Sequence, residues 1–356
     1  MKRLISLLIL FLPVFLITPA FSQNDTIPSQ YAASDTLQDN IGLFEKTEIL
    51  HLSLRFDITQ YTRKKPKEEY LDAILTYHIN DKDSVNKNIR IKSRGEFRNA
   101  FCTFPPIMIN LKKTENRRED MKKIEKVKLV THCKSGNEDN LLKEYLIYKL
   151  YNVLSDVSFR ARLVRIDYIN TAKKNKTVTS FGFLIEPINV LAERTNKIEV
   201  ESVNLGQKDM VPEILDRMAI FNYMVGNADW SIPNQHNCKV LLDAKAQTTS
   251  LGIPVPYDFD YSGMVNASYA VPNETSSIKT VRERIYTGTC RSKETFEKEL
   301  VEFTENKAEF YRIVNDFPYI SAKGKKEIIQ YLDEFYEGFD SRNSIINDFL
   351  STCKKM

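Results

Sequence analysis

The chain has 356 residues, enough for one large domain or for two lobes that share a cleft, and its 42% hydrophobic content is ordinary for a globular protein. Its 51 Lys and Arg residues nearly balance its 47 Asp and Glu residues, which gives no support to nucleic acid as the main partner. The five cysteines lack C-x-x-C spacing and a histidine cluster, which argues against zinc. One or two disulfides are possible, and the odd number of cysteines leaves at least one free thiol.

The first residues have the layout of a secretory signal. A basic start at Met1-Lys2-Arg3 precedes an apolar run to Thr18, and small residues follow at Ala20-Phe21-Ser22. A retained membrane anchor is the alternative, which the short, proline-interrupted apolar run disfavours. We predict a signal peptide over residues 1–22, a flexible leader over 23–44, and an exported chain, periplasmic or secreted, without a stable transmembrane anchor.

The next part of the chain, residues 45–186, reads mainly as strands. Leu50 to Ile58 places apolar side chains on alternate positions, which is the period of a strand. One helix is predicted from Asn140 to Leu154, where leucines recur every four residues. Further strands are predicted at 71–79, 88–93, 107–111, 127–130, 164–169 and 177–185.

Residues 187–356 are predicted to be mainly helical. An apolar helix runs from Val211 to Gly226, since glycine commonly ends a helix, and further helices include Phe296 to Phe303 and Ile328 to Tyr336. The sequence therefore predicts an α+β protein with a strand-rich N-terminal lobe and a mainly helical C-terminal lobe.

Two polar motifs lie in this second part. The first is Gly226-Asn227-Ala228-Asp229-Trp230-Ser231-Ile232-Pro233-Asn234, and the second is Pro256-Tyr257-Asp258-Phe259-Asp260. An Asp with an Asn five positions later, and a second Asp at the end of an apolar strand, are the minimal polar set for magnesium-bound ATP and an acceptor hydroxyl. Taken singly, each residue reads as a helix cap or a turn residue.

The order of these motifs resembles the CotH-type (spore-coat) atypical kinases and, more distantly, HipA-type and phosphatidylinositol kinases. Ser93-Arg94-Gly95-Glu96-Phe97-Arg98 resembles the Arg-Gly-Asn segment of CotH-type proteins, and Phe183-Leu184-Ile185-Glu186 resembles their strand that leads into the link between lobes. The chain departs from the family where Glu96 replaces Asn and where the strand at 107–111 lacks a lysine. The resemblance implies a bilobal protein-kinase-like fold that binds ATP with Mg or Mn.

The resemblance also implies site residues. Asp229 would accept or orient the proton of the acceptor hydroxyl. The oxygen ligands of the metal would be Asn234, Asp258 and Asp260. A cation is also needed at the phosphates. Lys128 is one candidate because its neighbours Val127 and Leu129 in an apolar strand point the other way, although a solvated strand face is the alternative, and Arg94 is the other candidate. Glu144 would steady either cation, and the strand end at Glu186 would lie beside the adenine ring.

The implied function is transfer of phosphate from ATP to a hydroxyl of a protein or cell-envelope component. ATP is scarce outside the inner membrane, so two alternatives stay open: an inactive kinase-like binding module of the envelope, and nucleotidyl transfer on the same scaffold. The intact set of Asp229, Asn234 and Asp258 favours an enzyme.

Overall fold

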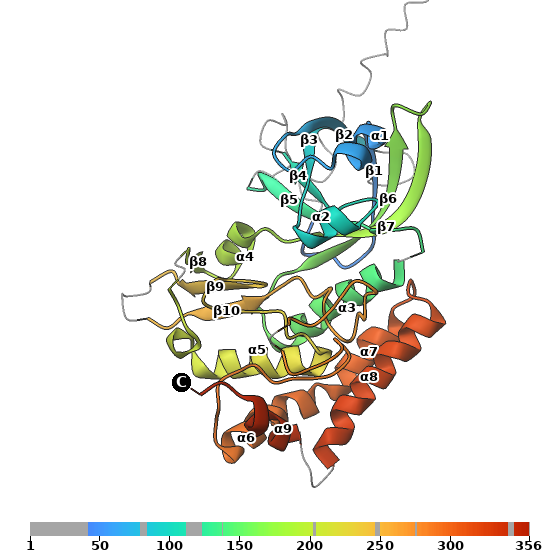
Figure 1. Cartoon of the computed structure of the whole chain (residues 1–356). Helices are drawn as coiled ribbons and strands as arrows, with labels where there is room; N and C mark the ends of the chain where they lie inside the picture. The colour runs from blue at the N-terminus through green and yellow to red at the C-terminus, as the bar shows by residue number, and fades with distance from the viewer. Residues whose placement is uncertain are drawn as a thin grey trace, which may run out of the picture. The chain divides into compact units, whose positions relative to one another are not determined.

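The computed structural model describes residues 42–78, 84–111, 123–136, 138–201, 204–245, 250–274, 276–340 and 345–355. The predicted signal peptide, and the predicted leader up to residue 41, lie outside these residues. Residues 40–356 form one compact unit (Figure 1). No helix in the described ranges is long and apolar enough to cross a membrane.

Seven of the described strands form a closed barrel (Figure 1). They are β1 (Leu50–Phe56), β2 (Leu71–His78), β3 (Ser84–Ser93), β4 (Ile107–Asn110), β5 (Lys126–Val130), β6 (Ala161–Asn170) and β7 (Lys176–Ile185). Their order around the barrel is β1-β2-β3-β4-β5-β7-β6. The parallel pairing of β1 with β6, in which Leu52 lies opposite Ile166, closes the sheet.

Apolar side chains at alternate positions of the strands fill the barrel interior, as the sequence predicts. In β2, for example, Ala73, Leu75 and Tyr77 are buried on one face. Two short helices interrupt the strands: α1 (Ile58–Lys64) and α2 (Phe97–Phe101). The strand predicted through Ile58 ends earlier because the Asp57 side chain accepts a hydrogen bond from the Gln60 N–H at 2.7 Å and begins α1.

The remaining elements combine helices with a second sheet (Figure 1). The helices are α3 (Glu138–Leu154), α4 (Ile188–Arg194), α5 (Pro212–Val225), α6 (Lys293–Glu305), α7 (Lys307–Asp316), α8 (Ala322–Asp340) and α9 (Ile345–Thr352), with a 3₁₀ turn at Gln207–Asp209. The sheet has the order β10-β9-β8, from β8 (Lys197–Glu199), β9 (Cys238–Asp243) and β10 (Ile253–Pro256). Disulfides join Cys102 to Cys133 and Cys290 to Cys353, and Cys238 is a buried free thiol.

The predicted bilobal protein-kinase-like arrangement is wrong. The strand-rich part closes into a seven-stranded barrel, and the part predicted to be mainly helical carries a three-stranded sheet of its own. Helix α3 is buried on nearly every face because it packs against β6 and β7 of the barrel and against α5, α7 and α8. One hydrophobic core therefore joins Leu146 and Tyr151 of α3 to Phe221 and Leu332. The domain boundary at residue 186 stays a prediction.

Candidate functional site

A cavity of about 340 Å³ lies where β4, β5 and the end of β7 approach β9 and the residue after β10. Most of its lining is apolar, with lysines from β5 and β9 among the polar groups. Pockets of this size and composition are typical of small-molecule sites. Its lining residues are Met108, Glu125, Lys126, Lys128, Phe159, Ile185, Glu186, Pro187, Ile188, Asn189, Lys239 and Tyr257.

Lys128 is a cation in this wall that has no ion-pair partner among the described residues. Its neighbours Val127 and Leu129 are buried in the barrel core, so Lys128 faces the other way, as the sequence predicts. Its ammonium lies 4.7 Å from the centre of the Tyr257 ring, and no described residue forms an ion pair with it. Burial, and after it the nearby charge of Arg94, lower the pKa of Lys128 to about 8, against the opposing effect of Asp258.

Arg94 adds a second cation next to Lys128. The Arg94 backbone N–H donates to the Pro106 carbonyl at 3.0 Å, which fixes the residue at the end of β3. Its Nε is buried and has no hydrogen-bond partner among the described residues. Two neighbouring cations, one with an unsatisfied donor, are suited to an anion with several oxygens, such as a phosphate chain.

Asp258 lies two residues after the end of β10 in a left-handed conformation, with φ of +61°, which is uncommon for a residue with a side chain. Its backbone N–H donates to the hydroxyl of Tyr148 in α3 at 2.9 Å. The charge of the Asp258 carboxylate raises the pKa of both Lys128 and Glu144. Within the described ranges no side chain or backbone N–H donates to that carboxylate, which leaves its oxygens open to a ligand.

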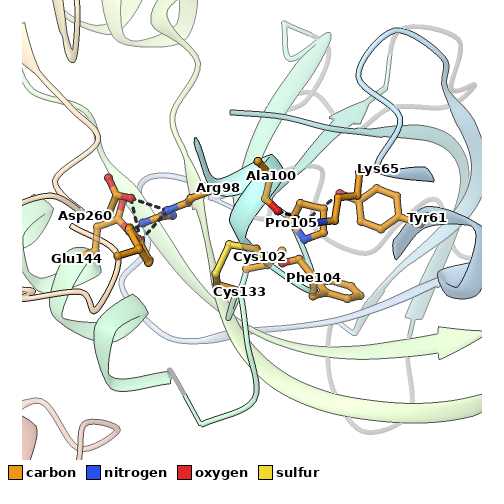
Figure 2. The surroundings of a disulfide bond; sticks show 12 residues. Tyr61, Lys65, Arg98, Ala100, Cys102, Phe104, Pro105, Cys133, Glu144 and Asp260 are labelled. Carbon is orange, nitrogen blue, oxygen red and sulfur yellow. Dashed lines mark hydrogen bonds and ion pairs between the residues drawn. A yellow bond between two sulfur atoms is a disulfide. The ribbon is translucent and has the colours of Figure 1, made fainter. Parts of the chain in front are cut away.

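The predicted residues Asp260 and Glu144 lie together, but their cation is one that the sequence did not single out. Arg98 of α2 donates from Nε to Asp260 Oδ2 at 2.7 Å and from Nη2 to Glu144 Oε2 at 2.5 Å (Figure 2). Glu144 was predicted to steady Lys128 or Arg94, and it pairs with Arg98 instead. Burial raises the pKa of Asp260 and raises that of Glu144 to about 8. In the sequence, this role of Arg98 was indicated only by its place as the second arginine of the segment at 93–98.

Asp229 is held in place and partly open to solvent. Helix α5 ends at Gly226, with φ of +68°, as the sequence predicts, and the loop that follows carries Asp229. Asp229 Oδ1 lies 2.9 Å from His236 Nε2, and Oδ2 accepts from Asn237 Nδ2 at 2.9 Å. The Asp229 side chain remains 38% exposed. A carboxylate that is oriented and accessible can accept a proton from a bound hydroxyl.

The amide next to Asp229 belongs to Asn237 rather than to Asn234. Asn234 is exposed in the turn between Ser231 and His236, where its Oδ1 accepts from the His236 N–H at 3.3 Å. The Asn237 side chain also donates to the Asp229 carbonyl at 2.8 Å, while its own carbonyl accepts from the Tyr257 N–H at 3.0 Å. Asn237 therefore connects the two motifs. Its sequence signal is its place directly before the apolar strand at 238.

Glu186 lines the cavity, but its carboxylate is already engaged. Both oxygens accept from Arg194, with Nε to Oε1 and Nη2 to Oε2 each at 2.9 Å, and Oε2 also accepts from the Arg160 N–H at 3.1 Å. The carboxylate therefore supports the end of β7. The apolar side chains of Ile185 and Ile188 are what this segment offers a ligand.

A preformed metal centre is not found in the described part of the chain. No group of three or more His, Cys, Asp or Glu side chains there is arranged to hold a metal ion. Magnesium commonly binds through one or two carboxylates together with phosphates and water. Asp258 fits that pattern, because its carboxylate accepts no hydrogen bond from a described residue and acts electrostatically on Lys128, the cation that would contact the same phosphates.

No family model matches the chain, and no curated protein matches it. Among solved structures, a similar one is the crystal structure of the proinflammatory kinase CtkA of Helicobacter pylori, at 11% sequence identity. The match covers 73% of this chain and 86% of that chain, with a TM-score of 0.31. A similarity this low supports no conclusion on the fold or function, so the resemblance to CotH-type kinases stays a prediction.

Proposed function

We propose that the protein is a nucleotide-dependent phosphotransferase whose nucleotide binds in the cavity beside Lys128. The supporting observation is a pair of neighbouring cations. Lys128 lies in the wall of a mainly apolar cavity with no ion-pair partner among the described residues, and Arg94, whose Nε has no hydrogen-bond partner there, is close enough to lower its pKa. Apolar walls that include Ile185 and the Tyr257 ring suit a flat base, and the two cations suit its phosphates.

In the proposed reaction, Asp229 accepts the proton of the acceptor hydroxyl as its oxygen attacks the terminal phosphorus. The bond between that phosphorus and the bridging oxygen breaks, and the nucleoside diphosphate leaves. His236 and Asn237 keep the Asp229 carboxylate oriented for this step. A magnesium or manganese ion held by Asp258 and the phosphates would neutralise the developing charge, with Lys128 and Arg94.

The acceptor and location are part of the same proposal. A hydroxyl of a protein or of a cell-envelope component is the proposed acceptor, and the predicted signal peptide supports export. An inactive binding module would use the same cavity but would have no use for an accessible carboxylate at Asp229. The Asp229 carboxylate is fixed by hydrogen bonds and partly exposed, which favours an enzyme over an inactive binding module.

The test is calorimetric titration of residues 23–356 with ATP in the presence of magnesium or manganese. We expect binding that Asp258→Ala abolishes, while Asp316→Ala, which changes an exposed carboxylate on α7, binds as the unaltered chain does. Equal ATP affinity in Asp258→Ala and the unaltered chain would show that the metal assignment is wrong.

A second experiment separates the two transfer chemistries. Label from γ-labelled ATP on an acceptor indicates phosphoryl transfer, and label from α-labelled ATP indicates nucleotidyl transfer. We expect the γ label alone, and its loss in Asp229→Ala. Labelling that persists in Asp229→Ala would remove Asp229 from the reaction.

A further inference from the structure

Arg98 lies in a buried cluster of polar side chains with Glu144 and Asp260 (Figure 2). Its guanidinium bridges Glu144 of α3 and Asp260 of the loop after β10, and the exposed fractions of the three side chains are 11%, 0% and 7%. Tyr269 completes the cluster, because its hydroxyl donates to Asp260 Oδ2 at 2.8 Å and accepts from Arg98 Nε at 3.1 Å. Arg98 thereby joins the barrel segment to two separate parts of the chain.

This contact fixes the loop that carries Asp258. Asp260 is two residues after Asp258, and Tyr269 follows nine residues later, so Arg98 holds both ends of the segment 260–269. Tyr148 holds the Asp258 N–H on the other side. A left-handed conformation at a residue with a side chain persists only where its surroundings impose it. Tyr148, through the Asp258 N–H, and Arg98, through Asp260, are the residues that constrain the backbone here.

The helix that carries Arg98 is followed directly by a disulfide cysteine. Helix α2 has five residues, too few to be stable alone. The helix ends at Phe101, and the next residue is Cys102, whose N–H donates to the Arg98 carbonyl at 2.9 Å and whose sulfur is bonded to Cys133 (Figure 2). The Phe104 N–H donates to the Cys133 carbonyl at 2.9 Å, so the chain on the far side of Cys102 is tied to the same place.

We propose that Arg98 is a positioning residue for Asp258, and that the Cys102–Cys133 disulfide holds Arg98 in that position. The nucleotide site is then complete only in the chain whose disulfide has formed. The proposed function supplies the role of Asp258, whereas the hold of Arg98 on the loop is a property of the folded chain without any ligand.

Hydrogen exchange of the backbone at 258–262, measured without nucleotide, tests the hold directly. We expect exchange at least tenfold faster in Arg98→Met and in the double variant Cys102→Ala with Cys133→Ala. The matched control removes the other disulfide, with Cys290→Ala and Cys353→Ala, and should leave this loop at its original rate. Arg98→Lys keeps the positive charge but lacks the guanidinium that contacts two carboxylates at once. We expect its exchange rate at 258–262 to lie between those of the unaltered chain and Arg98→Met. This variant keeps the test possible if Arg98→Met does not fold.

The affinity for ATP with magnesium is the second measurement. We expect it to fall at least tenfold in Arg98→Met and in the Cys102 and Cys133 double variant, and to be retained in the control that lacks the other disulfide. Unchanged exchange at 258–262 in the Arg98 variants, or the same acceleration on loss of either disulfide, overturns the inference even if ATP binds. Absence of ATP binding to the unaltered chain overturns the proposed function instead, while faster exchange in the variants still supports the hold of Arg98 on the loop.

Discussion

Replacing Lys128 with methionine should stabilise the protein while removing its affinity for nucleotide. The pKa of Lys128 falls from 10.5 to about 8 on folding, mainly because burial disfavours the charged form. A fall of this size in pKa corresponds to at most about 3 kcal/mol of destabilisation of the folded chain at pH 7. The contact of the ammonium with the Tyr257 ring returns part of that cost, so we expect a gain of about 1–3 kcal/mol in the variant.

The assay is urea unfolding at several pH values without nucleotide, followed by ATP titration. Between about pH 8 and 10.5 the unfolded chain holds a proton on Lys128 that the folded chain has lost, so folding stability rises with pH in that window. The advantage of Lys128→Met should therefore be complete below about pH 8 and disappear by about pH 10.5. Lys176→Met, which changes an exposed lysine at the start of β7, is the control and should change stability by less than about 0.5 kcal/mol.

Two outcomes would refute this reasoning. If Lys128→Met is less stable than the unaltered chain at pH 7, the ammonium has a partner that neutralises it. If the variant is more stable but binds ATP as tightly as before, the charge has another use and the phosphates do not contact it.

Three further predictions follow from the same region. Asp229→Asn should retain ATP affinity in calorimetry but lose phosphate transfer, because the amide cannot accept the proton; transfer at the original rate would contradict the role of a base. Glu144, whose pKa is raised to about 8 by burial, holds a proton in the folded chain that the unfolded chain loses above about pH 4.5, so stability should fall as pH rises towards 8, and Glu144→Gln should flatten that slope in urea midpoints at pH 5 and 8. If stability still falls between pH 5 and 8 in Glu144→Gln, a group other than Glu144 binds the proton. Gly226→Ala should cost about 2 kcal/mol or more, because φ is +68° and the added Cβ would lie 2.0 Å from the Tyr331 hydroxyl, and a variant with the original melting temperature would contradict that contact.

Local patterns in the sequence predicted much of the barrel. Strand alternation located most strands to within a few residues, and the buried neighbours Val127 and Leu129 showed that Lys128 points out of the core. Pairing between distant strands leaves no such trace, so the parallel contact of β1 with β6, and with it the closed barrel, was not predictable. The sequence also predicts helix α3 as part of the first lobe. Its leucine spacing indicates one buried face, but it does not reveal that α5, α7 and α8 cover the opposite face.

The candidate site was predictable where its residues are close in sequence. Gly226, Asp229 and Asp258 were found from two short motifs, but the hairpin between Ser231 and His236 lengthens the loop and brings Asn237, not Asn234, to Asp229. Arg98 could not be assigned from the sequence because its partners lie 46 and 162 residues away.

The parallel pairing of β1 with β6 also sets an order of events during folding. Strand β1 ends at Phe56, whereas its partner spans Ala161 to Asn170, so the barrel cannot close until more than a hundred further residues have been made. Contacts this distant in sequence slow folding, and an open sheet edge is a site for pairing with other chains. A nascent chain that stops before residue 161 therefore exposes β1 along one edge, and we expect it to need protection from aggregation until β6 arrives.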